Sequence, residues 1–521
     1  MLNFWNNPEL VRHRRAELRR SRAIGTALVV VALCILIGLA CWAKHDSEMQ
    51  SLRRYAEWNH ATTEQIQVME QRNPIEFWFL FYRSLIYAQL GVLTFWVLFS
   101  CAQSVSAERE RKTWDFQRTT RLQPRELLIG KLFGEPVLAY FVVLCCMPIT
   151  VVAGLLGEAK FLHIVYAYTL IFSSAIFLGL IGLWISSLFE SRSRGVGLIG
   201  TIGIYAIIAL STSLAEENFP GFAALSPLTG IVSLLRPRNA VSPPAIFNHI
   251  VPWVFVSLLL YVLIGVWFVV MLLRNLKRER DDIHLLSRWQ VVGCAALLNF
   301  LAYALFHPNP HMDVTKSEFV NEIVGMNIVI LLAMGLATLT AHERLKVWWR
   351  QWRAGTASLF SNDGLAWPWL ALSTIVSYGL LIWGVSAWHN RLLDRPGALQ
   401  MGAIQLLGIL IFITRDVLFI QWCMLTRMRM PLVKGVLYLA LYYVSAAMIA
   451  TVLSIGGHEF NWQFVSLTTP VGVFGPNDNG FHFPATVFAG MAIQLAIIMG
   501  LLMMINRRLS RSAAVSAIAT G

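Results

Sequence analysis

Long apolar stretches separated by short polar segments fill the chain from end to end. Each stretch is close to the roughly 20 residues that a helix needs to cross the hydrocarbon core of a bilayer. The pattern therefore predicts an all-α polytopic membrane protein of about twelve transmembrane helices. The predicted spans lie near residues 23–43, 79–104, 134–157, 162–188, 196–214, 251–273, 289–306, 322–341, 367–388, 401–424, 432–455 and 484–505.

The distribution of basic residues orients these spans. With the N-terminus in the cytosol, the cytosolic side holds the Arg-rich start, residues 107–131, 190–194, 274–288, 342–353 and 426–434, and the tail from Arg507. These segments hold much of the total of 42 Lys and Arg residues, as the positive-inside rule requires. We therefore expect a multi-pass protein with both termini in the cytosol.

Composition agrees with a membrane location. Hydrophobic residues make up 56% of the chain, charged residues 14%, and the mean hydropathy is +0.59. The cytosolic loops account for the net charge of +13, so we expect no nucleic-acid partner. Only His307, His311 and Asp313 suggest metal ligands, and they share one outside loop without convergent partners. We therefore expect no metal site.

Two outside loops are rich in Pro and Gly. They lie at residues 215–250 and 456–484 and are only partly polar. Loops of this kind often dip back into the membrane where protein covers them.

Short similarities indicate that the chain contains two copies of a six-span unit. Residues 107–117 align with residues 341–351 without a gap, and residues 225–230 resemble residues 468–472. With six spans each, the two copies would have the same orientation, as in a parallel repeat. Chance similarity between apolar spans is the alternative.

The most informative stretch is residues 106–134, SAERERKTWDFQRTTRLQPRELLIGKLFG. It resembles the permease of type-2 ABC exporters. In that family an acidic Glu-x-Glu segment after the second span is followed by a Thr, a hydrophobic helix and a Glu-x-x-x-Gly-Lys start to the third span. The matching positions are Glu108, Glu110, Thr113, Glu126, Gly130 and Lys131. Two positions depart from the family: Lys112 stands where Gly is common, and Arg121 where Pro is common.

The resemblance implies a domain plan. Residues 1–22 would form an amphipathic elbow helix, residues 23–280 the first six-span unit with a coupling helix near 105–131, and residues 281–521 a diverged second unit with a coupling segment near 341–363. The chain would then be a fused pseudo-dimer. The residues expected to couple to an ATPase are Glu108, Arg109, Glu110, Arg111, Thr113, Glu126, Gly130, Lys131, Glu343 and Arg344.

The resemblance also implies a function. The chain would be the permease subunit of an ABC exporter in the bacterial cytoplasmic (inner) membrane, moving an unidentified substrate outward. It lacks a Gly-x-x-x-x-Gly-Lys-Ser/Thr sequence, so a separate ATPase subunit would bind and hydrolyse ATP. We expect no cofactor in this chain and no enzymatic activity of its own. Membrane lipids and further accessory subunits would be its other partners.

Arg415 and Asp416 lie in the middle of the tenth predicted span. Charges at that depth are costly and usually face the interior of a helix bundle. They would form either a substrate-facing or gating pair or an internal salt bridge. Two other functions remain open: an ion-coupled secondary transporter, for which two parallel six-span halves are common, and a membrane-embedded transferase acting on lipid-linked substrates.

Overall fold

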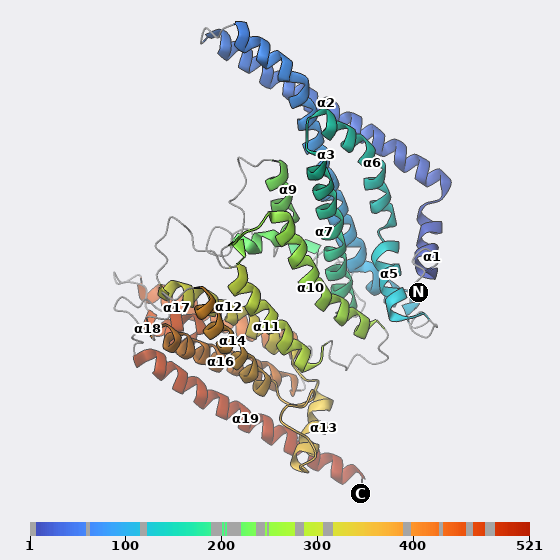
Figure 1. Cartoon of the computed structure of the whole chain (residues 1–521). Coiled ribbons are helices and arrows are strands. Elements are labelled where there is room, and N and C mark those ends of the chain that lie inside the picture. The colour runs from blue at the N-terminus through green and yellow to red at the C-terminus, as the bar shows by residue number, and fades with distance from the viewer. Residues whose placement is uncertain are drawn as a thin grey trace. The chain divides into compact units, whose positions relative to one another are not determined.

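The structure is a computed structural model of the whole chain (Figure 1). It describes residues 7–58, 63–114, 122–188, 201–202, 204–205, 220–235, 245–246, 249–276, 286–305, 316–388, 397–426, 431–454, 462–474 and 485–520. The chain divides into two compact units, residues 1–281 and residues 282–521.

The first unit is almost entirely helical. Its one described sheet is a two-stranded antiparallel ribbon, in which Ala245 pairs with Ile250. The elements are α1 (Pro8–Glu17), α2 (Arg20–Trp58), α3 (Thr63–Glu110), α5 (Pro124–Gly134), α6 (Val137–Leu156), α7 (Phe161–Leu188), η2 (Pro220–Leu225), α9 (Pro227–Leu235), β1 (Ala245–Ile246), β2 (His249–Ile250) and α10 (Trp253–Asn275).

The second unit is helical throughout its described residues. The elements are α11 (Arg288–Leu305), α12 (Lys316–Ala337), α13 (His342–Arg353), α14 (Trp367–Trp388), α16 (Gly397–Met424), α17 (Pro431–Ser454), α18 (Trp462–Thr468), η3 (Pro470–Phe474) and α19 (Ala485–Thr520).

Among the described residues, ten helices are long and apolar enough to cross a membrane. This confirms an all-α, multi-pass membrane protein. The predicted span at residues 196–214 lies largely outside the described residues. The helix α14 covers the predicted span at residues 367–388 and contains no charged residue.

One long helix forms the centre of each unit. In the first unit α3 packs against α2, α6 and α7, and in the second α16 packs against α12, α14, α17 and α19. Helices in lipid gain little from the hydrophobic effect when they meet, so close packing of small residues holds them together. At Gly182 of α7, a Cβ atom would lie 2.7 Å from the carbonyl oxygen of Leu98 of α3, which shows how closely these helices approach.

Both Pro-rich loops carry short helices that contact transmembrane helices well inside their length. In the first unit, the Tyr261 hydroxyl donates to the Leu225 carbonyl at 3.3 Å. Tyr261 lies eight residues after Trp253, the first residue of α10, or about 12 Å along the helix at 1.5 Å per residue. In the second unit, Tyr442 of α17 donates to the Thr468 carbonyl at 2.9 Å. Both loops therefore return into the helical bundle, as their composition predicts.

Candidate functional site

The predicted elbow helix starts on a side-chain cap that also ties it to α5. The Asn7 side-chain oxygen accepts hydrogen bonds from the backbone N–H groups of Glu9 (3.0 Å) and Leu10 (3.5 Å). Pro8 follows the cap, where a missing N–H has no consequence. The Asn7 side-chain amide donates to the Glu126 carbonyl at 2.7 Å. One residue thus begins α1 and fastens it to the first turn of α5.

Gly130 allows α1 and α5 to lie in close contact. A Cβ atom at Gly130 would lie 2.5 Å from the Cβ of Glu9, a distance that real atoms do not reach. At the other end of the motif, Glu126 accepts a hydrogen bond from the Gln123 backbone N–H at 2.9 Å and so caps α5. These two motif residues therefore shape α5 and the surface on which α1 packs.

The end of α3 is a tight turn with a left-handed residue. Lys112 has φ of 58°. Its N–H donates to the Arg109 carbonyl (3.0 Å), and the Thr113 N–H donates to the Glu108 carbonyl (3.0 Å). This is the Schellman pattern, whose left-handed position is usually glycine because a side chain there is strained. The turn thus explains why Gly is common in the family at the position of Lys112.

A buried ion pair joins this end of α3 to α5. The Lys131 side chain is completely buried, and its ammonium donates to Glu108 at 2.5 Å and to the Ser104 hydroxyl at 3.3 Å. The ammonium also lies 5.4 Å from the centre of the Trp114 ring. The second oxygen of Glu108 lies 3.3 Å from the guanidinium of Arg12 on α1. Three segments distant in sequence therefore meet at one carboxylate.

The ion pair belongs to a larger network. Glu9 contacts Arg12 at 2.7 Å and His13 at 3.4 Å, and His13 lies 3.7 Å from Glu135. The Ser104 hydroxyl donates to Glu135 at 3.0 Å. We call this network the elbow cluster: Glu9, Arg12, His13, Ser104, Glu108, Lys131 and Glu135.

Electrostatics within the elbow cluster favour the ionised form of Glu9. Burial by itself would raise the pKa of Glu9, but the hydrogen bond to His13 and the charges of Arg12 and Lys131 lower the pKa below its ordinary value. The carboxylate therefore stabilises the folded state in its charged form.

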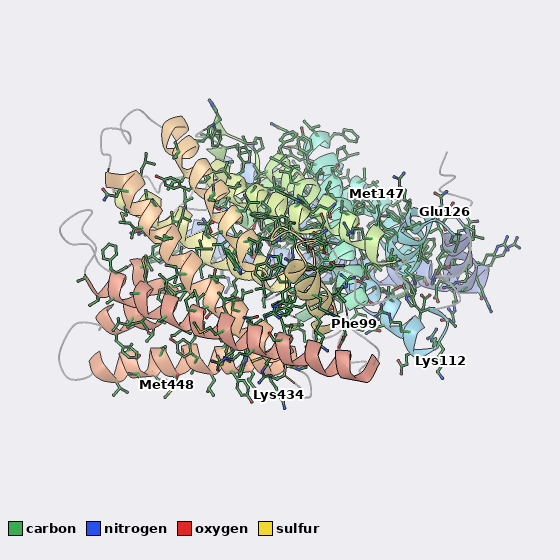
Figure 2. All side chains as sticks on the ribbon, turned by 90° about the horizontal axis from the view of Figure 1, so that it is seen from below. Phe99, Lys112, Glu126, Met147, Lys434 and Met448 are labelled. Atoms are coloured by element: carbon green, nitrogen blue, oxygen red, sulfur yellow. The ribbon has the colours of Figure 1, made fainter. Side chains whose placement is uncertain are left out.

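The residues predicted to couple to an ATPase divide into two groups. Glu108, Gly130 and Lys131 are buried, whereas Glu110, Arg111 and Thr113 are exposed and Arg109 is half-buried beside Trp114. The exposed residues lie around Lys112, which Figure 2 labels at the edge of the first unit. Residues 115–121 of the predicted coupling helix lie outside the described residues. No spacing along the sequence indicates the partners of the buried group, which are Asn7, Glu9, Arg12, His13, Ser104 and Glu135.

The aligned segment of the second unit has a different local structure. Ala341 precedes α13, a continuous helix through Lys346, which aligns with the left-handed Lys112. The Glu343 side chain is 81% exposed and contacts Lys346 at 3.1 Å, and Arg344 contacts Asp363 at 3.1 Å. The two aligned segments therefore have different backbone conformations.

Arg288 fixes the loop that follows α13, although nothing in the sequence pattern singled it out. Its buried guanidinium donates to the carbonyls of Thr338, Ser361, Gly364 and Leu365 at 2.6–3.0 Å. It also donates to the Thr340 hydroxyl at 2.6 Å. One side chain thus satisfies backbone groups on both sides of α13.

Arg415 and Asp416 form an ion pair at 2.6 Å inside the second unit. The guanidinium also donates to Gln494 (2.8 Å), the Thr468 carbonyl (3.4 Å) and the Tyr443 hydroxyl (2.9 Å). Tyr443 in turn donates to Asp416. Both side chains are buried among these groups, which fits an internal salt bridge that also holds the end of α18.

In the part of the chain that the structure describes, no three His, Cys, Asp or Glu side chains come together as a metal site. The motif of His307, His311 and Asp313 lies outside the described residues.

One family model matches the chain: residues 10–237 match the ABC-2 type transporter. The match includes most of α1 together with α2, α3, α5, α6, α7 and α9, and thus the whole elbow cluster except Glu9. No curated protein and no solved structure matches the chain. The match, the position of the motif and the transmembrane helices agree. Residues 10–237 are thus similar to the ABC-2 type transporter family, which supports an ABC-2 permease.

Proposed function

We propose that this permease is the membrane-spanning subunit of an ABC exporter and that a separate ATP-hydrolysing subunit energises it. It would move a substrate out across the cytoplasmic membrane of a bacterium, with both of its termini in the cytosol. The sequence contains no Walker A motif, which supports an ATPase on another chain.

The observation that carries this proposal is an exposed turn on a rigid base. Glu110, Arg111, Lys112 and Thr113 are exposed at the end of the long helix α3. Directly beneath them, the buried pair of Glu108 and Lys131 ties α3 to α5. A partner that pushes on the turn would move α3, α5 and α1 together, because the elbow cluster joins all three. This is the mechanical requirement for coupling ATP hydrolysis to the membrane domain.

We restrict the proposed ATPase contact to the first unit. Glu343 pairs with Lys346 on the continuous helix α13, and Arg344 of the same helix pairs with Asp363 of the following loop, so no turn presents either residue. Ion-coupled transport gains no support from Arg415 and Asp416, because protein groups already satisfy both charges.

Co-purification tests the proposal. The tagged chain is isolated from its native host, and its partners are identified by mass spectrometry. We expect an ABC ATPase to co-purify with the wild-type chain. It should no longer co-purify with the Glu110→Ala/Arg111→Ala variant. The matched control is Lys44→Ala/Glu48→Ala. It also removes one exposed basic and one exposed acidic side chain, here 3.8 Å apart, on the part of α2 predicted to lie outside.

Three outcomes would contradict the proposal. In the first, no ATPase accompanies the wild-type chain. In the second, the ATPase remains bound to Glu110→Ala/Arg111→Ala at the wild-type level. In the third, the chain alone in liposomes accumulates a solute in response to an ion gradient.

A further inference from the structure

Arg288 shows that two candidate transmembrane helices, α11 and α12, and the predicted span α14 of the second unit end at one level. It lies at the start of α11 and donates to the Thr338 carbonyl just after α12 and to the Leu365 carbonyl just before α14. A single guanidinium reaches both, so these three ends share one face of the membrane. The segment between them, α13 and residues 354–366, therefore lies at the boundary between hydrocarbon and water.

Aromatic side chains mark the same level. Trp289, at the start of α11, is 61% exposed, and Trp367, at the start of α14, is 36% exposed. Phe360 packs edge-on against Trp369 with ring centres 5.5 Å apart. Such aromatic belts are typical of the layer where lipid headgroups meet acyl chains.

The apolar stripe of α13 is only partly covered by protein. Leu345, Trp348 and Trp349 are buried in one apolar cluster with residues of α16 and α19, and Figure 1 shows α13 beside the C-terminal part of α19. Trp352 continues the stripe by one more turn, stacked on Trp348 with ring centres 5.9 Å apart. It is nevertheless 45% exposed. Within the part of the chain that the structure describes, the last turn of the stripe is thus only partly covered by protein.

The loop after α13 extends this uncovered apolar surface. Leu359 is 41% exposed and Phe360 is 49% exposed. The loop is held in place, because Arg288 binds the Ser361 and Gly364 carbonyls and Trp348 donates to the Ser358 carbonyl at 3.1 Å. An ordered backbone therefore presents these two side chains outward.

Basic side chains make up much of the surface of α13 outside the apolar stripe. The helix α13 carries Arg344, Lys346, Arg350 and Arg353 but only one acidic residue, Glu343. Arg350 and Arg353 are exposed, and the Arg353 guanidinium lies 3.9 Å from the centre of the Trp349 ring. The surface is thus positive beside exposed apolar groups, the combination with which amphipathic helices bind anionic bilayers.

We propose that α13 and residues 354–366 form a binding surface for anionic phospholipid. Trp352, Leu359 and Phe360 enter the acyl-chain boundary, and Arg350 and Arg353 bind the headgroup phosphates. The second unit is then anchored to lipid through the segment whose sequence aligns with the exposed turn of the first unit. The position of this surface at the membrane boundary, shown by the helix ends at Arg288 and by Trp289 and Trp367, favours lipid over a protein surface. The proposal holds whichever partner the first unit binds.

Nitroxide labelling tests the proposal in nanodiscs of phosphatidylcholine with or without phosphatidylglycerol. In a variant whose seven native cysteines are replaced, the labels are placed by Trp352→Cys and Leu359→Cys, with Gln351→Cys on the polar face as the control. We expect both test labels to be severalfold more accessible to oxygen than to a water-soluble nickel chelate, and the control label to show the reverse. With phosphatidylglycerol present, the test labels should lie deeper in the bilayer. Arg350→Gln should abolish this change in depth.

Native mass spectrometry gives a second measurement that keeps all cysteines. We expect Arg350→Gln and Arg353→Gln to retain fewer phosphatidylglycerol molecules than the wild type. Arg507→Gln, which neutralises an exposed arginine of α19, should retain the wild-type number.

Three results would overturn the proposal. The test labels could be as open to the nickel chelate as the control label. They could lie in lipid but respond neither to phosphatidylglycerol nor to Arg350→Gln, which would remove the headgroup site. Finally, a bound ATPase could shield both test labels from both reagents, which would assign this surface to a protein.

Discussion

The buried pair of Lys131 and Glu108 yields the sharpest test of the elbow cluster. Glu108→Leu leaves the Lys131 ammonium completely buried, and among the described residues Ser104 remains as its hydrogen-bond partner beside the Trp114 ring. Removing one member of a buried ion pair costs about 3–5 kcal/mol, because the other charge stays desolvated. Lys131→Met should cost less, since Glu108 still lies 3.3 Å from the half-exposed Arg12.

The double variant shows whether Glu108 and Lys131 stabilise the fold as a coupled pair or independently of each other. Replacing both charges removes the desolvation cost together with the attraction, so Glu108→Leu/Lys131→Met should be more stable than Glu108→Leu alone. Arg12→Gln is the matched control: its side chain is 52% exposed, and exposed pairs contribute about 0–1 kcal/mol.

Thermal unfolding of the purified chain, followed by size-exclusion chromatography, measures all four variants. A loss of 1 kcal/mol lowers the Tm by about 2–4 °C for a cooperative unit of roughly this size. Glu108→Leu should therefore lower it by about 6 °C or more, and Arg12→Gln by no more than a few degrees. If the double variant loses as much as the two single variants together, the two charges are not coupled and the reasoning fails.

Three further outcomes are expected. Lys112→Gly should raise the Tm, because glycine adopts the left-handed backbone at φ 58° without strain. The net gain in stability is about 0.5–1 kcal/mol after subtracting the cost of the more flexible unfolded chain. A lower Tm would show that Lys112 is not strained. Because the folded-state pKa of Glu9 is lowered, its stabilisation is complete above the unfolded value near 4.5 and is lost as the pH falls through the lower folded pKa. Glu9→Gln should therefore flatten the fall of Tm with pH in that acidic range, and an unchanged curve would refute the linkage. Arg288→Gln should open the loop after α13 to chymotrypsin at Phe360, because Gln cannot supply the donors of the guanidinium; cleavage at the wild-type rate would contradict this.

The candidate site was only partly visible in the sequence. The motif residues Glu126, Gly130 and Lys131 could be found because their spacing is local. Their tasks could not be assigned, because each depends on a partner from a distant segment: Glu108 for Lys131, and Glu9 for Gly130. The departure at Lys112 also became interpretable only through its backbone conformation.

The second unit shows a different limit of the sequence. The alignment of Lys346 with Lys112 rests on residue identity, which does not determine where a helix ends. In the first unit α3 continues to Glu110, whereas in the second α12 ends at Ala337 and α13 begins after Ala341. Arg288 acts on both sides of that break, and no spacing along the chain indicates its role.

The sequence by itself determined the class of protein and the positions of most transmembrane helices. A bilayer requires long apolar stretches whose backbone hydrogen bonds are satisfied within a helix, and hydropathy along the chain reports this directly. The tertiary structure alone decided which charges are buried and paired and which are presented to a partner. Burial and pairing depend on contacts between residues far apart in the chain, such as Arg12 with Glu108 or Arg415 with Gln494, and folding alone brings these together.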